Sequence, residues 1–100
     1  MIRHVVMWKM LDHAQGALRA DNLRKAKALL EELPGLIPAI RSLQAGIGSR
    51  LDPQAFDLVL IAEFASQETL RSYLEHPEHQ RVAAFLRAVR SERTVVDVEI

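Results

Sequence analysis

The sequence contains no cysteine, and this absence removes several classes of function at once. A chain without thiols has no disulfide bonds, no cysteine nucleophile and no cysteine-ligated zinc or iron–sulfur centre. An excess of charge of one sign is also missing, because 13 Lys and Arg residues balance 13 Asp and Glu residues. Nucleic-acid-binding domains usually carry a basic field or cluster, so this balance argues against a nucleic-acid partner.

Long hydrophobic runs are missing as well. No apolar stretch approaches the roughly 20 residues that cross a bilayer, and Arg3, His4 and Lys9 interrupt the apolar segment at the N-terminus. A secretory signal would need an unbroken apolar core and a small-residue cleavage site. We therefore expect a cytoplasmic protein without a membrane partner. With no repeat, linker or low-complexity segment, the chain is expected to form one domain over residues 1–100.

What is present is an alternation of strand and helix patterns. Short segments rich in apolar and β-branched residues predict four strands, at residues 2–10, 39–49, 56–64 and 92–100. Apolar stripes at helical spacing predict helices at residues 21–33, from Ser66 to 74 and from Pro77 to about 90, with a polar loop at 11–17. This βαββαβ order, with its second helix broken in two, predicts an α+β, ferredoxin-like fold. Such a fold has a four-stranded antiparallel sheet with its helices on one face.

The first and third predicted strands are apolar on both faces. Side chains alternate between the faces of a sheet, so Val6 and Trp8 lie on one face of the first strand while Val5 and Met7 lie on the other. Helices can cover only one face, and large exposed apolar patches are rare on monomers. We therefore predict a homodimer that pairs sheet on sheet, with Trp8 or its neighbours at the interface. A monomer that uses the open face as a ligand cleft is the alternative.

Chemistry-bearing residues concentrate in the segment Tyr73-Leu-Glu-His76-Pro-Glu-His79. His79 shares the inward stripe of the last helix, and in the first helical turn the positive end of the macrodipole disfavours imidazolium. A neutral imidazole beside an apolar cavity suits a general base. Tyr73 can donate a hydrogen bond to a carbonyl or enolate oxygen. His4, on the first strand with Trp8, can line the same cavity.

Each of these residues also has a purely structural interpretation. His76 precedes Pro77 and can cap the following helix. His79 can bond to a backbone carbonyl, and Tyr73 can be a core residue with its hydroxyl at the rim. Trp8 can pack in a dimer core. His76 and His79, with the glutamate between them, offer two nitrogens and an oxygen to a metal, but the two imidazoles are expected to diverge. We therefore expect no metal and no cofactor.

Three segments resemble the stress-responsive A/B barrel domain (Dabb) family: "IRHVVMWKM", "LEELPGLIPAIRSLQAG" and "YLEHPEHQRVAAFLRAVRSERTVVDVEI". The resemblance implies a ferredoxin-like fold that pairs through its sheet into a dimeric α/β barrel. Many bacterial members have no assigned activity, and one type of member, olivetolic acid cyclase, closes a polyketide chain by an aldol reaction. That similarity, at the Tyr-x-x-His-Pro-x-His motif, implies Tyr73 and His79 as catalytic residues and His4 as part of the pocket.

Three functions remain open on this sequence. The first is a homodimer of unassigned activity that binds a small apolar or carbonyl-containing ligand between helix and sheet, through His4, Trp8 and His76. The second is an enzyme that cyclises or isomerises a carbonyl compound by acid–base catalysis with Tyr73 and His79. The third is a cofactor-free monooxygenase, which rests only on analogy with related dimeric α/β barrels.

Overall fold

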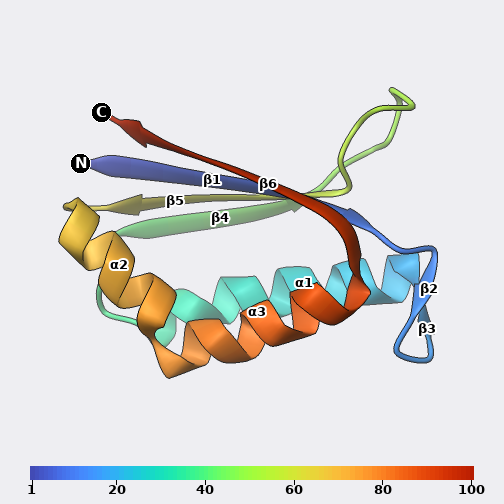
Figure 1. The fold of residues 1–100 in the computed structure, drawn as a ribbon, viewed down its shortest axis with the longest axis horizontal. Coiled ribbons are helices and arrows are strands. Elements are labelled where there is room, and N and C mark those ends of the chain that lie inside the picture. Colours follow the sequence, from blue (N-terminus) through green and yellow to red (C-terminus); the bar gives the residue numbers. More distant parts are fainter.

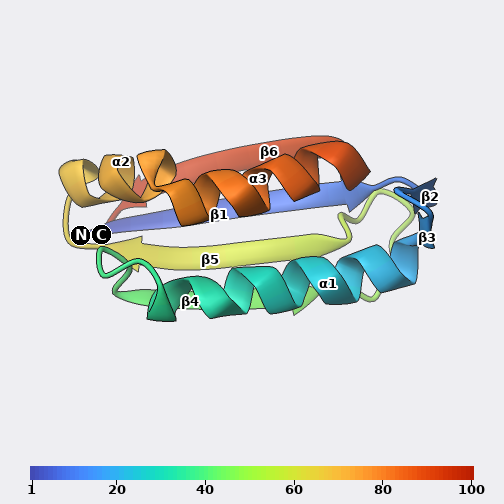
Figure 2. The same cartoon turned by 90° about the horizontal axis from the view of Figure 1, so that it is seen from below.

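A four-stranded antiparallel sheet and a layer of helices make up the computed structural model, which describes residues 1–100 (Figures 1 and 2). The strands are β1 (Ile2–Met10), β4 (Ser42–Ile47), β5 (Leu58–Phe64) and β6 (Arg90–Glu99), in the spatial order β4-β5-β1-β6. The helices α1 (Arg19–Glu32), α2 (Gln67–Glu75) and α3 (Pro77–Val89) lie on one face of the sheet (Figure 1). The structure confirms the predicted α+β fold. None of the three helices is long and apolar enough to span a membrane.

Element boundaries differ from the prediction at several places. The predicted polar loop at 11–17 contains a small hairpin, β2 (His13–Ala14) and β3 (Ala17–Leu18). Its two turn residues, Gln15 (φ 52°) and Gly16 (φ 74°), both have the positive φ that a two-residue hairpin turn favours. Helix α1 begins at Arg19, two residues earlier than predicted, and β4 and β5 are shorter than predicted. A 3-10 turn, η1 (Leu33–Gly35), follows α1.

The broken second helix follows the prediction closely. Ser66 caps α2, since its hydroxyl accepts from the Thr69 N–H at 3.2 Å while Thr69 Oγ1 accepts from the Ser66 N–H at 3.0 Å. The next helix begins at Pro77, and the His76 ring caps it by accepting from the Glu78 N–H at 3.1 Å through Nδ1. The His76 cap and the proline at the first position of α3 explain why two short helices stand here instead of one.

The two faces of the sheet have different surroundings. Beneath the helices, β1 buries Ile2, Val6, Trp8 and Met10, whereas Met7 on the opposite face is 36% exposed. Trp8 is only 4% exposed, so Trp8 itself does not lie on the open sheet face, whereas its neighbour Met7 does. Alternation along a strand defines two faces, but it does not say which face the helices will cover.

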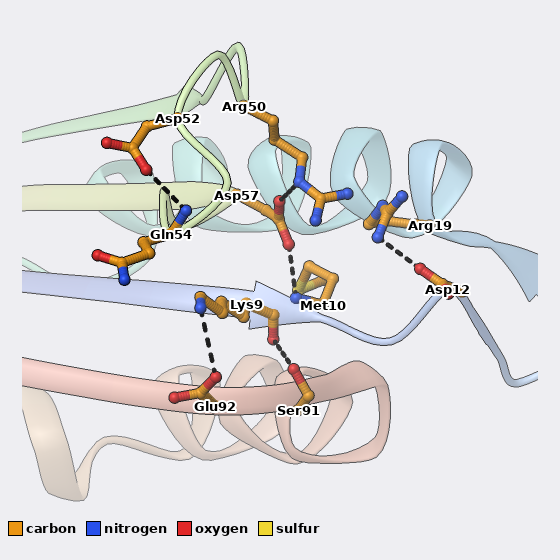
Figure 3. A network of polar contacts seen from close by, with 10 residues as sticks. All are labelled: Lys9, Met10, Asp12, Arg19, Arg50, Asp52, Gln54, Asp57, Ser91 and Glu92. Carbon is orange, nitrogen blue, oxygen red and sulfur yellow. Dashed lines mark hydrogen bonds and ion pairs between the residues drawn. The ribbon is translucent and has the colours of Figure 1, made fainter.

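One end of β1 is held by a buried carboxylate (Figure 3). Asp57, directly before β5, accepts from the Met10 N–H at 2.8 Å through Oδ2. Its Oδ1 lies 2.9 Å from Arg50 Nε, an ion pair without the alignment of a hydrogen bond. At the base of this β4–β5 connection, a side chain at Gly48 would place its Cβ 2.7 Å from the Phe56 carbonyl oxygen. The connection therefore needs glycine at position 48 and the buried Asp57.

Candidate functional site

A cavity of about 220 Å³ lies between α3 and the sheet. Its apolar lining comes from β1, α1 and α3 and includes Val6, Trp8, Leu30, Val82 and Leu86. All five of these side chains are buried in the hydrophobic core. The chain turns back at the end of α3 and runs into β6 alongside β1, which brings the last helix and the last strand to the same cavity (Figures 1 and 2).

His79 enters this cavity from the first turn of α3. Its Nδ1 lies 3.0 Å from the Leu74 carbonyl oxygen, which can only accept, so Nδ1 carries the hydrogen and Nε2 carries the lone pair of the neutral ring. Burial lowers the pKa of His79, and the bond to Leu74 opposes that shift. Electrostatic interactions with His4, Arg93 and Arg87 lower this pKa further. The backbone bond therefore orients the ring and leaves a free basic nitrogen.

Tyr73 lies beside His79, with 4.5 Å between the ring centroids. The Tyr73 side chain is fully buried, and its hydroxyl has no hydrogen-bond partner in the protein. Burial raises the pKa of Tyr73 to about 12, against a smaller lowering by Arg93. The phenol therefore stays protonated at neutral pH and is an uncommitted donor inside the cavity. It is not at the rim, as the alternative interpretation of Tyr73 had it.

His4 completes a trio of rings with Tyr73 and His79. Its ring centroid is 6.1 Å from that of Tyr73, and the His4 residue is only 2% exposed. Its Nδ1 lies 2.5 Å from Asp97 Oδ1, a carboxylate presented by β6, because the β1–β6 register places His4 opposite Asp97. The carboxylate orients the imidazole, and Nε2 is left without a bond to the protein.

Four of the five predicted site residues thus come together: His4, Trp8, Tyr73 and His79 all line the cavity. His76 does not line it, because its ring Nδ1 is used in the cap of α3. The His79 bond to a backbone carbonyl and its place in the cavity, treated as alternatives in the sequence, occur together. No group of three or more His, Asp or Glu side chains is arranged to hold a metal ion.

Sequence reasoning missed the polar residues that reach the cavity from the end of α3 and from β6. Arg87, Arg90 and Arg93 line the cavity, and Asp97 holds His4. Burial lowers the pKa of Arg93, and its neighbour Arg90 lowers it further. The spacing of three between these arginines was visible in the sequence. It crosses a helix–strand boundary, where no single periodicity applies.

Comparison with solved structures shows a shared fold. A dimeric protein of unknown function with a ferredoxin-like fold from Bacteroides fragilis is 25% identical, with a TM-score of 0.84, covering 99% of this chain and 95% of that one. A dimeric ferredoxin-like protein of unknown function from Thermobifida fusca is 22% identical, with a TM-score of 0.85 and coverages of 99% and 90%. Hydroxynitrile lyase from Passiflora edulis is 19% identical, with a TM-score of 0.76 and coverages of 99% and 92%.

No curated protein matches this sequence. The family comparison, in contrast, spans nearly the whole chain, since the model of the stress responsive A/B barrel domain matches residues 2–100. The three motif segments found in the sequence all fall within that match. The chain therefore belongs to the stress responsive A/B barrel domain (Dabb) family.

Proposed function

We propose that this protein binds a small carbonyl-containing molecule in the cavity between α3 and the sheet. The observation that carries the proposal is the Tyr73 hydroxyl, which is fully buried and has no partner in the protein. A buried donor without an acceptor costs about 1–3 kcal/mol. A ligand carbonyl oxygen that accepts from this hydroxyl would recover that free energy, while the apolar body of the ligand would contact Trp8 and Leu86.

The same geometry supports a second step, acid–base catalysis on the bound molecule. His79 Nε2 would take a proton from the carbon next to the carbonyl: the C–H bond breaks, an N–H bond forms, and the electron pair moves into the enolate. Tyr73 would donate its hydrogen bond to the enolate oxygen, and return of the proton to carbon completes an isomerisation or exchange. The lowered pKa of His79 supports this role because it keeps the ring neutral near pH 7.

Family relationships support an enzyme without naming its reaction. Hydroxynitrile lyase from Passiflora edulis shares the fold, so the fold carries an enzymatic activity in that protein. The similarity of the Tyr73-to-His79 motif to olivetolic acid cyclase stays a prediction, and it assigns the same two residues to acid–base chemistry. The substrate of this chain is left open by both relationships.

Octan-2-one in D2O provides a direct test, because it presents one carbonyl, exchangeable neighbouring hydrogens and an apolar chain. NMR should show chemical-shift changes for residues of the cavity and faster deuterium exchange beside the carbonyl than in buffer. Tyr73→Phe should lose binding, while His79→Ala should keep binding and lose exchange. His13→Ala, an exposed histidine on β2, is the matched control and should behave as the wild type. Unchanged binding by Tyr73→Phe would contradict the proposal.

We further propose that the open face of the sheet pairs with a second copy of the chain. Three neighbours with this fold are described as dimeric, which supports self-association. On that face Val5 stands opposite Ile61 on one side and Val96 on the other, and Val96 is 54% exposed. This apolar row across three strands would be covered by its copy in a two-fold dimer.

The interface can be tested with a charge on this row. Ile61→Lys should convert a dimer to monomer or aggregate at micromolar concentration, measured by light scattering coupled to size exclusion. Ala84→Lys, exposed on the helical layer, is the matched control and should leave the dimer intact. A wild-type protein that is monomeric under these conditions would rule out the dimer.

A further inference from the structure

Three arginines around the cavity form no ion pair within 4 Å of a carboxylate. Seven other Lys and Arg side chains form ion pairs within 4 Å, and Arg81 of α3, for example, lies 3.0 Å from Glu78. Arg87, at the end of the same helix, has no such pair, and neither have Arg90 and Arg93, the next two arginines along the chain. Unpaired arginines are ordinary on a surface, but these three converge on one cavity.

No carboxylate lines this cavity to balance the three guanidinium groups. Asp97 interacts electrostatically with Arg93, but its Oδ1 is held by His4 at 2.5 Å. Arg93 lies partly buried beside the like charge of Arg90, and both burial and this charge lower the pKa of Arg93. Arginine stays protonated even so, because its pKa is very high. An anion at this position would relieve the repulsion and replace the lost water.

The cavity therefore has two parts of different character. Its inner wall is apolar and buried, with Trp8 4% exposed and Val82 1% exposed. Its rim is cationic, since Arg87 and Arg93 are exposed and Arg90 is half-buried. Guanidinium groups bind carboxylates through paired, charge-assisted hydrogen bonds, and these are the strongest hydrogen bonds available at such a rim.

We infer that the ligand is an organic acid whose carboxylate binds Arg87, Arg90 and Arg93 while its apolar body lies against Trp8 and Val82. The inference rests on the ligand cavity of the proposed function and narrows its substrate class to carbonyl compounds that also carry an acid group. The Tyr73 hydroxyl, which is fully buried in the same cavity and has no partner, would donate a hydrogen bond to the carbonyl oxygen of such a molecule.

The intrinsic fluorescence of Trp8 reports binding directly, because Trp8 is the only tryptophan in the chain and lines the cavity. Octanoate and octan-2-one have similar apolar bodies and differ in charge. We expect octanoate to bind roughly tenfold more tightly than octan-2-one, the effect of one charge-assisted hydrogen-bond pair. Added NaCl should weaken the binding of octanoate, because salt screens its charge, and should leave the binding of octan-2-one unchanged.

Two variants locate the effect at the rim. The double variant Arg90→Gln, Arg93→Gln should bind octanoate roughly tenfold or more less tightly than the wild type, and its affinity for octan-2-one should not change. Arg81→Gln removes an arginine of α3 that does not line the cavity, and it should bind both probes as the wild type. Far-ultraviolet circular dichroism should show the same secondary structure for all three proteins.

Each other outcome has one meaning. If octan-2-one binds as tightly as octanoate, or if the double variant binds octanoate normally, the arginine inference is wrong while the cavity still binds a carbonyl compound. If octyl phosphate binds more tightly than octanoate, the assignment to a carboxylate is wrong. If octanoate binds and octan-2-one does not, the arginine inference stands and the carbonyl proposal fails. If no probe changes Trp8 fluorescence at millimolar concentration, both proposals are wrong.

Discussion

Polar groups are buried at both ends of β1, but the partners available to these groups differ between the two ends. At the Met10 end, Asp57 accepts from the Met10 N–H through Oδ2, and its Oδ1 is in an ion pair with Arg50 that is not a hydrogen bond (Figure 3). At the His4 end, the Tyr73 hydroxyl is equally buried and has no partner. Asp57 is 1% exposed and Tyr73 is fully buried, so burial alone does not distinguish them.

The difference lies in what surrounds each group. Asp57 stands in closely packed backbone and joins the β4–β5 connection to β1, so its bonds stabilise the fold. Tyr73 faces a cavity that also contains the free Nε2 of His79. A buried polar group that is paired with a charge and a backbone N–H is part of the structure, whereas one without any partner beside a cavity is available to a ligand.

Asp57→Ala should produce the largest effect, because it leaves the buried Met10 N–H without an acceptor. We expect the free energy of unfolding to fall by about 3 kcal/mol, measured by urea denaturation. Asp52→Ala is the matched control. Asp52 accepts from the Gln54 N–H in an exposed turn, and its loss should lower stability by less than about 1 kcal/mol. Equal losses in the two variants would contradict a structural role specific to Asp57.

The next largest expected effect is the raised pKa of the Tyr73 phenol. Tyr73 is the only tyrosine, so phenolate absorbance reports it alone. We expect a midpoint near the pKa of about 12 in the folded protein and near the ordinary ~10 in urea. Since the unfolded phenol loses its proton first, stability should fall as pH rises from about 10 towards about 12. A folded-state midpoint near 10 would mean that the hydroxyl is exposed to water.

The pKa of His79 should be shifted less than that of Tyr73 and in the opposite direction, to a lower value. Burial lowers its pKa, so the folded imidazole should take up a proton below the ordinary ~6.5. As pH falls through 6.5 the unfolded ring binds a proton first, and stability should therefore decrease on acidification. His79→Gln should reduce this pH dependence, measured by urea denaturation at pH 7 and pH 5. An NMR titration that places the His79 pKa above 6.5 would rule out a neutral base.

Tyr73→Phe should change stability least, and this sharpens the contrast with Asp57. Removing a hydroxyl that has no partner leaves nothing unpaired, so the free energy of unfolding should stay constant or rise by less than about 1 kcal/mol. Phe64→Leu is the control, because the Phe64 ring centroid is 4.9 Å from that of Tyr73, and it should lower the free energy of unfolding by about 1 kcal/mol. A loss of more than about 1 kcal/mol in Tyr73→Phe would show that the hydroxyl has a structural partner.

Much of the fold follows from patterns a few residues long. The bounds of β1 match the prediction at both ends, and the helix break at Pro77 lies where the sequence places it. The inward position of His79 follows from helical spacing within α3. These features depend on backbone geometry and on hydrogen bonds between near neighbours, which the local sequence contains.

The candidate site was predicted in part, for a physical reason that His4 illustrates. Its presence near Tyr73 was expected, but its bond to Asp97 was not, because the two residues are 93 positions apart and meet only through the β1–β6 register. The arginines were missed for a related reason. Arg87 ends a helix and Arg93 lies in a strand, so no single period links them.

The sequence by itself determined the order of helices and strands, the two apolar faces of β1 and the helix break that orients His79. Only the tertiary structure decided which face of β1 the helices cover, and therefore that Trp8 lines a cavity. It also decided that Asp97 reaches His4, that three arginines converge on a cavity that no carboxylate lines, and that the Tyr73 hydroxyl has no partner. Local periodicity arises within one turn or one pleat, whereas these contacts depend on packing between segments far apart in the chain.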